Sequence, residues 1–247
     1  MSLLDLSAFE TVIFDLDSTL TNTHRYPIVA SEWLLKKIGI DSEELMSSYI
    51  RNLVIRYRKA LQAIVEGAPF RSPFDIIYTA MKNSLEDIEQ KVDSTLVNEA
   101  TQRFKALHLE LSTPYDGVLE ILEKLKARNI KLGVISNSFA GHARIILTNL
   151  ELDYFFSSIV DCGDVNAYKP MKEPFERVLR ELNTEVSRSI YIGDEYYADM
   201  VGAKLVGLTT IWINNRNISL EDQVAKYGSS STPDFVLSST HEFLQLF

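Results

Sequence analysis

The sequence predicts an α/β protein in which a doubly wound, parallel sheet is interrupted by an all-helical insertion. From about residue 114 onward, short runs of β-branched and aromatic residues alternate with amphipathic stretches of helical period. This alternation is typical of a parallel sheet with helices on both faces. Residues 22–113, in contrast, lack clear strands and are rich in helix-forming residues. We therefore expect residues 1–21 and 114–247 to form an α/β core domain and residues 22–113 to form a separate helical domain.

The elements are predicted in chain order from their period and their flanking residues. A buried strand is expected at residues 11–14, whose sequence is Thr-Val-Ile-Phe. Further strands are expected at residues 131–136, 158–161, 189–193, 208–213 and 235–237. Core helices are expected at residues 118–127, 141–149, 174–182 and 199–206. The last of these ends before Gly207, a residue type suited to stopping a helix. Helices of the insertion are expected at residues 43–65, 74–81 and 88–107.

Composition narrows the class of protein. The 247 residues are 46% hydrophobic, enough for a sizeable core, and carry a formal net charge of −9. This acidity argues against a nucleic-acid partner, although a lysine, a metal ion and backbone N–H groups would still bind a small anion. The single cysteine, Cys162, excludes an internal disulfide, which fits a reducing cytosol. Because no cationic and apolar leader opens the chain and no apolar run approaches membrane length, we expect a soluble cytoplasmic protein with no membrane partner.

The most informative feature is a pair of aspartates at the end of the first strand. Asp15 and Asp17 follow the apolar run two positions apart, so in an extended chain their side chains face the same side. Two such carboxylates repel each other, and burial makes ionisation of either one more costly. A bound cation relieves both effects, and Mg²⁺ prefers hard oxygen ligands of this kind. The alternative is a polar turn in which these residues only cap the chain.

Polar residues also follow two other predicted strands. Ser136 and Asn137 come at the end of one strand, and Asp194 comes at the end of another, with Asp199 five residues later. Lys169 lies between these two strands in the sequence. Because the carboxyl ends of parallel strands line one crevice, we expect these side chains to meet in space. Taken singly, each has an ordinary explanation: a solvated lysine, a capping serine, or an acid at a helix N-terminus.

Together, and in this order, four segments resemble the motifs of the haloacid dehalogenase superfamily of hydrolases. The matching residues are Asp15, Asp17 and Thr19 in the first motif, Ser136 in the second, Lys169 followed by Pro170 in the third, and Gly193, Asp194 and Asp199 in the fourth. Each motif alone is weak, but the ordered set is specific and extends over essentially the whole chain. The resemblance implies a Rossmann-like core with a helical cap inserted between the first and second motifs.

The resemblance further implies a phosphatase-like member that uses Mg²⁺ and forms an aspartyl-phosphate. Asp15 is then the nucleophile, a role for which a carboxylate needs no prior deprotonation. Asp17 protonates the leaving oxygen and afterwards takes a proton from the attacking water. The metal is held by the side chains of Asp15 and Asp194 and by the backbone carbonyl of Asp17.

The remaining motif residues are implied to bind the phosphoryl group or to support the site. Ser136 and the backbone N–H of Asn137 bind phosphoryl oxygens, and Lys169 neutralises charge on the nucleophile and on the phosphate. Asp199 holds waters of the metal or orients Lys169, and Thr19 has a supporting role. The implied substrate is a small phosphorylated metabolite.

Other functions share this scaffold and remain open. Members that resemble dehalogenases lack the second acid, because displacing a halide requires no proton on an oxygen, so Asp17 favours phosphate-ester hydrolysis. A sugar-phosphate mutase is an alternative, although such members tend to have glycine where this chain has Ser18. A catalytically silent binding or regulatory protein would be expected to have lost at least one of four charged residues, and all four are present: Asp15, Asp17, Lys169 and Asp194.

Two features leave the subfamily and the substrate open. Glu195 stands where Ser or Thr is common after the acid of the fourth motif. The helical domain carries a basic run, Arg51, Arg56, Arg58 and Lys59. Such a run more often forms a solvated helix face than a binding site for an anionic leaving group.

Overall fold

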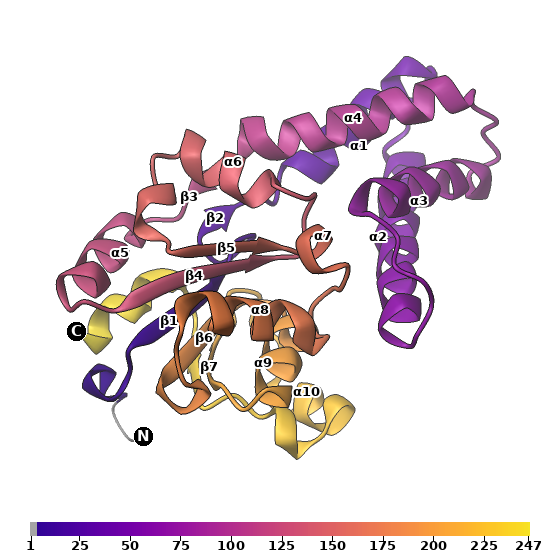
Figure 1. The fold of residues 1–247 in the computed structure, drawn as a ribbon. Helices are drawn as coiled ribbons and strands as arrows, with labels where there is room; N and C mark the ends of the chain where they lie inside the picture. Colours follow the sequence, from indigo (N-terminus) through magenta and orange to yellow (C-terminus); the bar gives the residue numbers. More distant parts are fainter. Residues whose placement is uncertain (1–3) are drawn as a thin grey trace. The chain divides into compact units, whose positions relative to one another are not determined.

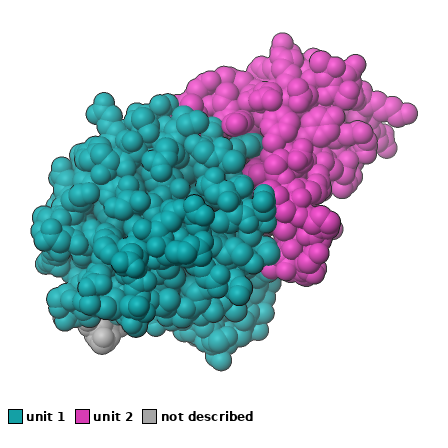
Figure 2. Space-filling view, in the orientation of Figure 1, with its two compact units in different colours: residues 1–22, 113–247 teal, residues 23–112 magenta. Residues whose placement is uncertain are grey.

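A computed structural model describes residues 4–247, which fold as two units. One unit contains the segment up to Asn22 together with Thr113–Phe247, and the other contains Thr23–Ser112 (Figure 2). The first unit is an α/β domain and the second is all-helical. Within residues 4–247, no helix combines the length and the apolar character needed to cross a membrane.

The α/β unit is built on a six-stranded sheet in which neighbouring strands are parallel. Its strands are β1 (Thr11–Asp15), β4 (Lys131–Ser136), β5 (Ser158–Asp161), β6 (Ser189–Gly193), β7 (Thr209–Ile213) and β8 (Phe235–Leu237). They lie in the order β5-β4-β1-β6-β7-β8 (Figure 1). From β1 the chain adds β4 and β5 on one side, then crosses back and adds β6, β7 and β8 on the other. The strand order therefore reverses at β1, and open α/β sheets bind ligands at the carboxyl ends of the strands at such a point.

Helices cover both faces of the sheet, as predicted. α8 (Lys172–Leu182) and α9 (Gly202–Leu205) pack on one face in a cluster of apolar side chains that includes Ile13. α5 (Val118–Ala127) contacts β4, and α6 (His142–Asn149) contacts β5. Figure 1 shows these two helices on the other side of the sheet from α8 and α9. Strands covered on both faces are apolar at successive positions, which explains the uninterrupted apolar run of β1.

The predicted boundaries of α5, β4 and β5 are confirmed, whereas the helix predicted at residues 199–206 is wrong in its first turns. A π-helical segment, η4 (Tyr196–Val201), precedes α9. The carboxylate of Asp199 accepts the backbone N–H of Glu195 at 2.9 Å. Backbone N–H groups at the start of a helix lack partners within the helix, and the Asp199 carboxylate satisfies that of Glu195. The helical segment therefore begins before Asp199 rather than at it.

Two other core helices differ from the prediction. α8 begins at Lys172 rather than at Pro174, because proline is tolerated in the first turn of a helix. α10 (Leu220–Tyr227) is absent from the prediction. The Ser219 hydroxyl caps α10 by accepting the N–H of Asp222 at 3.1 Å, so a capping serine was the available sequence signal. The short helix α7 (Cys162–Val165), which follows β5, was also not predicted.

The second unit consists of four helices, α1 (Tyr26–Lys37), α2 (Glu43–Val65), α3 (Pro73–Asp87) and α4 (Ser94–Leu111). α2 packs against α3, and α1 packs against α4. Ser72 and Asp93 accept backbone N–H groups at the starts of α3 and α4. The helix predicted at residues 88–107 is placed too early, because the Asp93 carboxylate accepts the N–H of Thr95 at 2.6 Å and starts α4 only there.

The basic run of the helical unit lies on α2. Arg56 donates through Nε to Oδ2 of Asp87 at 2.9 Å, which links α2 to α3. Arg51, Arg58 and Lys59 are exposed. Exposed ion pairs of this type contribute little to stability, and the arrangement supports the interpretation of the run as a solvated helix face.

The two connections between the units leave and re-enter the α/β unit side by side. β2 (Thr21–Asn22) and β3 (Thr113–Pro114) form a two-stranded antiparallel ribbon. Thr21 pairs with Pro114, and Asn22 pairs with Thr113. Because this ribbon closes the gap in the chain, the insertion interrupts the sequence of the α/β unit without opening its sheet.

Candidate active site

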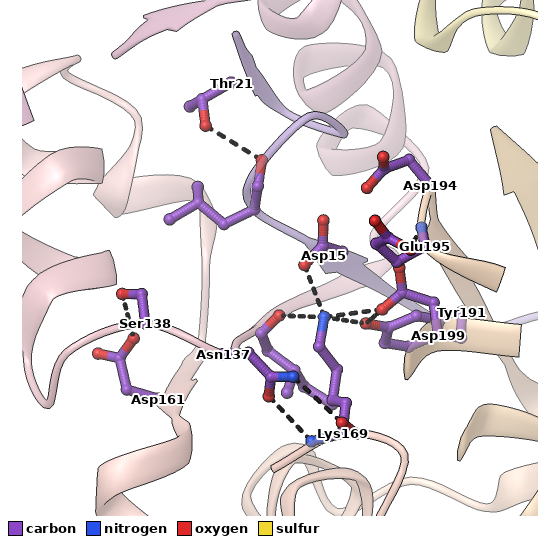
Figure 3. Close-up of polar contacts among 12 residues, drawn as sticks. Asp15, Thr21, Asn137, Ser138, Asp161, Lys169, Tyr191, Asp194, Glu195 and Asp199 are labelled. Atoms are coloured by element: carbon purple, nitrogen blue, oxygen red, sulfur yellow. Dashed lines mark hydrogen bonds and ion pairs between the residues drawn. The ribbon is translucent and has the colours of Figure 1, made fainter. Parts of the chain in front are cut away.

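A buried lysine lies at the centre of the candidate site. Lys169, in the loop before α8, is only 4% exposed. Its Nζ donates to Asp15 Oδ1 at 2.6 Å and to Asp199 Oδ1 at 2.7 Å (Figure 3). It also donates to the Tyr191 hydroxyl at 3.0 Å and to the carbonyl oxygen of Ile135 at 3.2 Å. Lys169 is therefore not a solvated surface lysine, the usual environment of this residue type.

These contacts decide the protonation of the lysine and of its partners. Burial alone would lower the pKa of Lys169, but the carboxylates of Asp15 and Asp199 outweigh it and hold this pKa well above its usual range. Burial raises the pKa of Asp15 to about 8; Lys169 opposes the rise, whereas Asp199 and Asp17 add to it. One lysine thus only partly compensates the crowded acids, and a further cation would lower the pKa of Asp15.

Three buried carboxylates form a group with the spacing of a cation site. Asp15, Asp194 and Asp199 each place one oxygen so that these atoms lie within 4.8 Å of one another. Burial raises the pKa of Asp194 well above its usual value, and Asp15 and Asp199 raise it further. Both oxygens of Asp199 are already engaged, Oδ1 by Lys169 and Oδ2 by the N–H of Glu195. Asp15 and Asp194 are therefore the carboxylates best suited to hold Mg²⁺, which prefers oxygen ligands.

The turn after β6 brings Asp199 against the strand. A Cβ atom at Gly193 would lie 2.4 Å from Cγ of Asp199, closer than such contacts occur. Only glycine permits this approach of backbone and side chain. Tyr191, two residues earlier and hence on the same face of the strand, donates its hydroxyl to Asp199 Oδ1 at 2.8 Å. β6 and η4 together therefore fix the carboxylate that holds Lys169.

Two buried hydroxyls near the strand ends have the character of binding groups. Ser136 ends β4 and is fully buried, as is Thr19. Within residues 4–247, neither Ser136 Oγ nor Thr19 Oγ1 has a hydrogen-bond partner. Leaving a buried hydroxyl without a partner is costly, so such groups indicate a place where a ligand supplies one.

The side chain of Asn137 has a role that the sequence did not suggest. Its Nδ2 donates to the carbonyl oxygen of Lys169 at 3.1 Å, and its Oδ1 accepts the N–H of Lys169 at 2.9 Å. The carboxamide therefore binds both the N–H and the carbonyl oxygen of the Lys169 backbone. This pair of bonds fixes the lysine loop against the end of β4.

Asp17 lies outside the group of three carboxylates. β1 ends at Asp15, and Asp17 pairs with Thr21 in an isolated bridge that spans a turn in which Ser18 has φ 63°. The sequence had suggested that the two aspartates project from one regular strand, and the structure shows that they do not. Asp17 is half-buried, and its charge raises the pKa of both Asp15 and Asp161, so it lies close enough to influence both acids.

Two residues of this region were not singled out from the sequence. Tyr191 has no distinctive signal, because an aromatic residue is ordinary in a buried strand. Asp161 ends β5 and accepts the Ser138 hydroxyl and the N–H of Ala143, each at 3.3 Å (Figure 3). Burial raises the pKa of Asp161 to about 7. The strand-end criterion that selected Asp194 would also have selected Asp161.

The fold and the site define a class of α/β protein in which a buried lysine and several acids meet where the strand order reverses. A model of the family described as haloacid dehalogenase-like hydrolase matches residues 12–213. The chain belongs to this family and is a hydrolase, as the four sequence motifs had indicated.

Individual relatives agree with this assignment. Pyrophosphatase PpaX from Bacillus mycoides (strain KBAB4) is 26% identical over 240 residues, which are 96% of this chain and 95% of the relative. Among solved structures, the HAD-hydrolase YfnB from Bacillus subtilis matches with a TM-score of 0.78 and 21% identity, covering 96% of this chain and 98% of that one. L-2-haloacid dehalogenase from Xanthobacter autotrophicus matches with a TM-score of 0.70 and 14% identity, over 96% and 98%. The structural matches show the fold, and the family together with the pyrophosphatase relatives supports a hydrolase of phosphoric ester bonds.

Proposed function

We propose that the protein is a Mg²⁺-dependent phosphatase that hydrolyses a small soluble phosphomonoester through an aspartyl-phosphate intermediate. The observation that carries the proposal is the Asp15 carboxylate, held by Lys169 at 2.6 Å beside a second buried acid, Asp194. Such an arrangement suits attack on an anionic centre, because the lysine offsets the negative charge of nucleophile and substrate. The relatives named pyrophosphatase support phosphorus as the atom attacked.

The reaction proceeds in two displacements at phosphorus. In the first, the Asp15 oxygen that does not contact Lys169 forms a bond to phosphorus while the bond to the leaving oxygen breaks, and Asp17 gives that oxygen a proton. In the second, water attacks the same phosphorus and gives its proton to Asp17. The bond between Asp15 and phosphorus then breaks and inorganic phosphate is released. Asp17 thereby ends each cycle in the protonated form in which it began.

The buried carboxylates of Asp15 and Asp194 fit a bound Mg²⁺, and the backbone carbonyl of Asp17 would be its third protein ligand in this proposal. When bound, the cation supplies positive charge that stabilises the phosphoryl oxygens. YfnB, one of the structural neighbours, was solved bound to magnesium. Asp199 then keeps Lys169 in place rather than binding the cation, in keeping with its 2.7 Å contact to Nζ.

The phosphoryl group binds between the ends of β1 and β4. We assign its oxygens to the Ser136 hydroxyl, the backbone N–H of Asn137 and the ammonium of Lys169. The unpartnered hydroxyl of Ser136 supports this assignment, because a phosphoryl oxygen would supply the missing acceptor. We give Thr19 a supporting role in the first motif; its hydroxyl is likewise buried and unpartnered.

The proposed partner is a small phosphorylated metabolite, with neither a nucleic acid nor a membrane involved, and the proposed compartment is the cytoplasm. Pyrophosphate belongs on the list of substrates to test because the sequence relatives are named for it. Asp17 favours phosphate esters over 2-haloacids, the substrates of one structural neighbour, and a sugar-phosphate mutase remains the alternative on the same site. A silent binding protein would show no turnover at all.

The first test is phosphate release from a panel of phosphomonoesters and pyrophosphate with Mg²⁺. We expect Asp15→Asn to lower turnover at least about a thousandfold, because removal of a nucleophile abolishes the covalent route. The exposed Asp116→Asn is the matched control and should leave turnover unchanged. Turnover retained in Asp15→Asn would place the nucleophile elsewhere, and silence of the wild type across the panel would favour the binding-protein alternative.

The second test is removal of the metal. We expect EDTA to abolish phosphate release and Mg²⁺ to restore it, because the crowded carboxylates need a cation to stay ionised beside an anionic substrate. Asp194→Asn should require a higher Mg²⁺ concentration for half-maximal rate. Hydrolysis that persists in EDTA would count against the assignment of Asp15 and Asp194 as ligands.

A further inference from the structure

The loop after β7 carries an arginine that reaches back to the candidate metal ligand Asp194. Arg216 donates through Nη2 to the carbonyl oxygen of Asp194 at 3.1 Å, and the same nitrogen lies 3.3 Å from Oδ2 of the Asp194 carboxylate. Its Nη1 donates to Oε1 of Glu195 at 2.8 Å. The indole of Trp212 also donates to the carbonyl oxygen of Asp194, at 2.9 Å. One guanidinium thus contacts the backbone carbonyl and the carboxylate of Asp194 and the carboxylate of Glu195, and neither the motifs nor the proposed reaction assigns it a role.

The ordinary explanation is an ion pair at the surface, which contributes little to stability. That explanation suits the contact between Arg216 and Glu195, whose side chains are 35% and 47% exposed. It does not suit the second contact, because the Asp194 side chain is only 4% exposed. Arginine presents its donors in a rigid, planar fork, so the geometry of Arg216 constrains the direction in which the buried carboxylate points.

The charges of Arg216 and Glu195 also affect how strongly the site would attract a cation. A lone guanidinium next to a metal ligand would repel a divalent cation. Glu195 is adjacent to Asp194 in the chain (Figure 3). It accepts a hydrogen bond from the other end of the fork and offsets that charge. The pair therefore supplies a hydrogen bond to the carbonyl oxygen of Asp194 and an ion-pair contact to its carboxylate, with little net charge.

We propose that Arg216, held by Glu195, is a positioning residue that orients the Asp194 carboxylate toward a bound Mg²⁺. This inference rests on the proposed metal site and extends it to Arg216 and Glu195, two residues to which the four motifs assign no role. Groups that orient metal ligands in this way typically change metal affinity by about 10–100-fold when they are removed.

The decisive experiment measures Mg²⁺ affinity directly, by calorimetry and by the rise in Tm with added MgCl₂, so that no substrate is needed. Replacing both residues (Arg216→Ala with Glu195→Gln) removes one positive and one negative charge and leaves the net charge unchanged. We expect the double variant to bind Mg²⁺ about tenfold more weakly than the wild type. Arg188→Ala, which breaks the exposed 2.6 Å pair with Glu10, is the control and should bind as the wild type does.

A second variant separates geometry from charge. Arg216→Lys keeps the positive charge but loses the planar fork, so positioning predicts weaker Mg²⁺ binding with an unchanged Tm in EDTA. Wild-type affinity in both Arg216→Lys and the double variant would overturn the inference. If the wild type itself shows no Mg²⁺ binding, the proposed metal site fails and this inference falls with it. If the wild type binds and the variants bind equally well, only the inference falls.

Discussion

Several acids are buried near the strand ends of this protein, and they differ in how their charge is compensated. Asp15 and Asp199 share the ammonium of Lys169, and Asp194 faces Arg216 at 3.3 Å. Asp161, in contrast, is held by neutral donors. We therefore expect the ionisation of Asp161 to change the free energy of unfolding directly, since neutral donors rather than a cation hold its carboxylate.

Asp161 should make the protein less stable as the pH rises. Burial raises its pKa to about 7 in the folded state, from 3.8 for the free side chain. The folded protein therefore binds the proton more tightly than the unfolded chain, so this contribution to stability is complete below pH 3.8 and is lost as the pH rises through about 7. Between pH 5 and pH 8 the loss amounts to about 2–3 kcal/mol. Asp161→Asn, which cannot ionise, should not show it.

Urea unfolding of the wild type and of Asp161→Asn at pH 5 and pH 8 tests this prediction. The difference in free energy of unfolding between the two proteins should shift in favour of the variant at pH 8. Acids that do not interact with Asp161 titrate alike in both proteins and cancel in the comparison. A difference that is the same at both pH values would show that the pKa of Asp161 is close to that of an exposed aspartate.

The turn that joins β6 to η4 depends on a glycine. Gly193→Ala would place Cβ 2.4 Å from Cγ and Oδ2 of Asp199, a side chain that is fully buried and bonded to Lys169. We expect a loss of about 1–3 kcal/mol in the free energy of unfolding, typical of overpacking. Phosphate release should fall as well, because a displaced Asp199 releases Lys169.

Gly39→Ala is the matched control for this turn. Gly39 has φ +78° but open space around its Cβ position, so its cost is that of backbone conformation alone, about 1 kcal/mol. Its phosphate release should match that of the wild type. If Gly193→Ala unfolds at the same urea concentration as the wild type, Asp199 moves freely and the fixed geometry inferred for β6 and η4 is wrong.

The success and failure of the sequence prediction have different physical causes in different elements. β4 and β5 were predicted with their observed ends because strands buried on both faces are apolar throughout and stop where polar residues begin. The start of η4 was misplaced because it depends on the Asp199 side chain bonding to the N–H of Glu195, which no periodicity reveals. Arg216 was not found for a similar reason: an arginine in a loop is ordinary until the fold brings it to Asp194.

The division of the molecule into two units separates the residues of the candidate site from the insertion. The residues that contact Lys169 in the candidate site, and the clustered carboxylates, belong to the α/β unit. The helical unit is instead held by its own packing, α2 on α3 and α1 on α4. This separation predicts that the site forms in the α/β unit even when the helical unit is removed.

A deletion of residues 23–112 tests that prediction. Asn22 and Thr113 are paired partners in the antiparallel ribbon of β2 and β3, so a two-residue turn such as Asn-Gly can join them without altering the ribbon. We expect the shortened protein to unfold cooperatively in urea and to be stabilised by Mg²⁺ as the full chain is. We also expect it to retain hydrolysis of a small aryl phosphate, because the residues of the proposed site lie in the retained unit. Mg²⁺ stabilisation lost in a shortened protein that still folds would contradict the prediction and would mean that the helical unit contributes to the site.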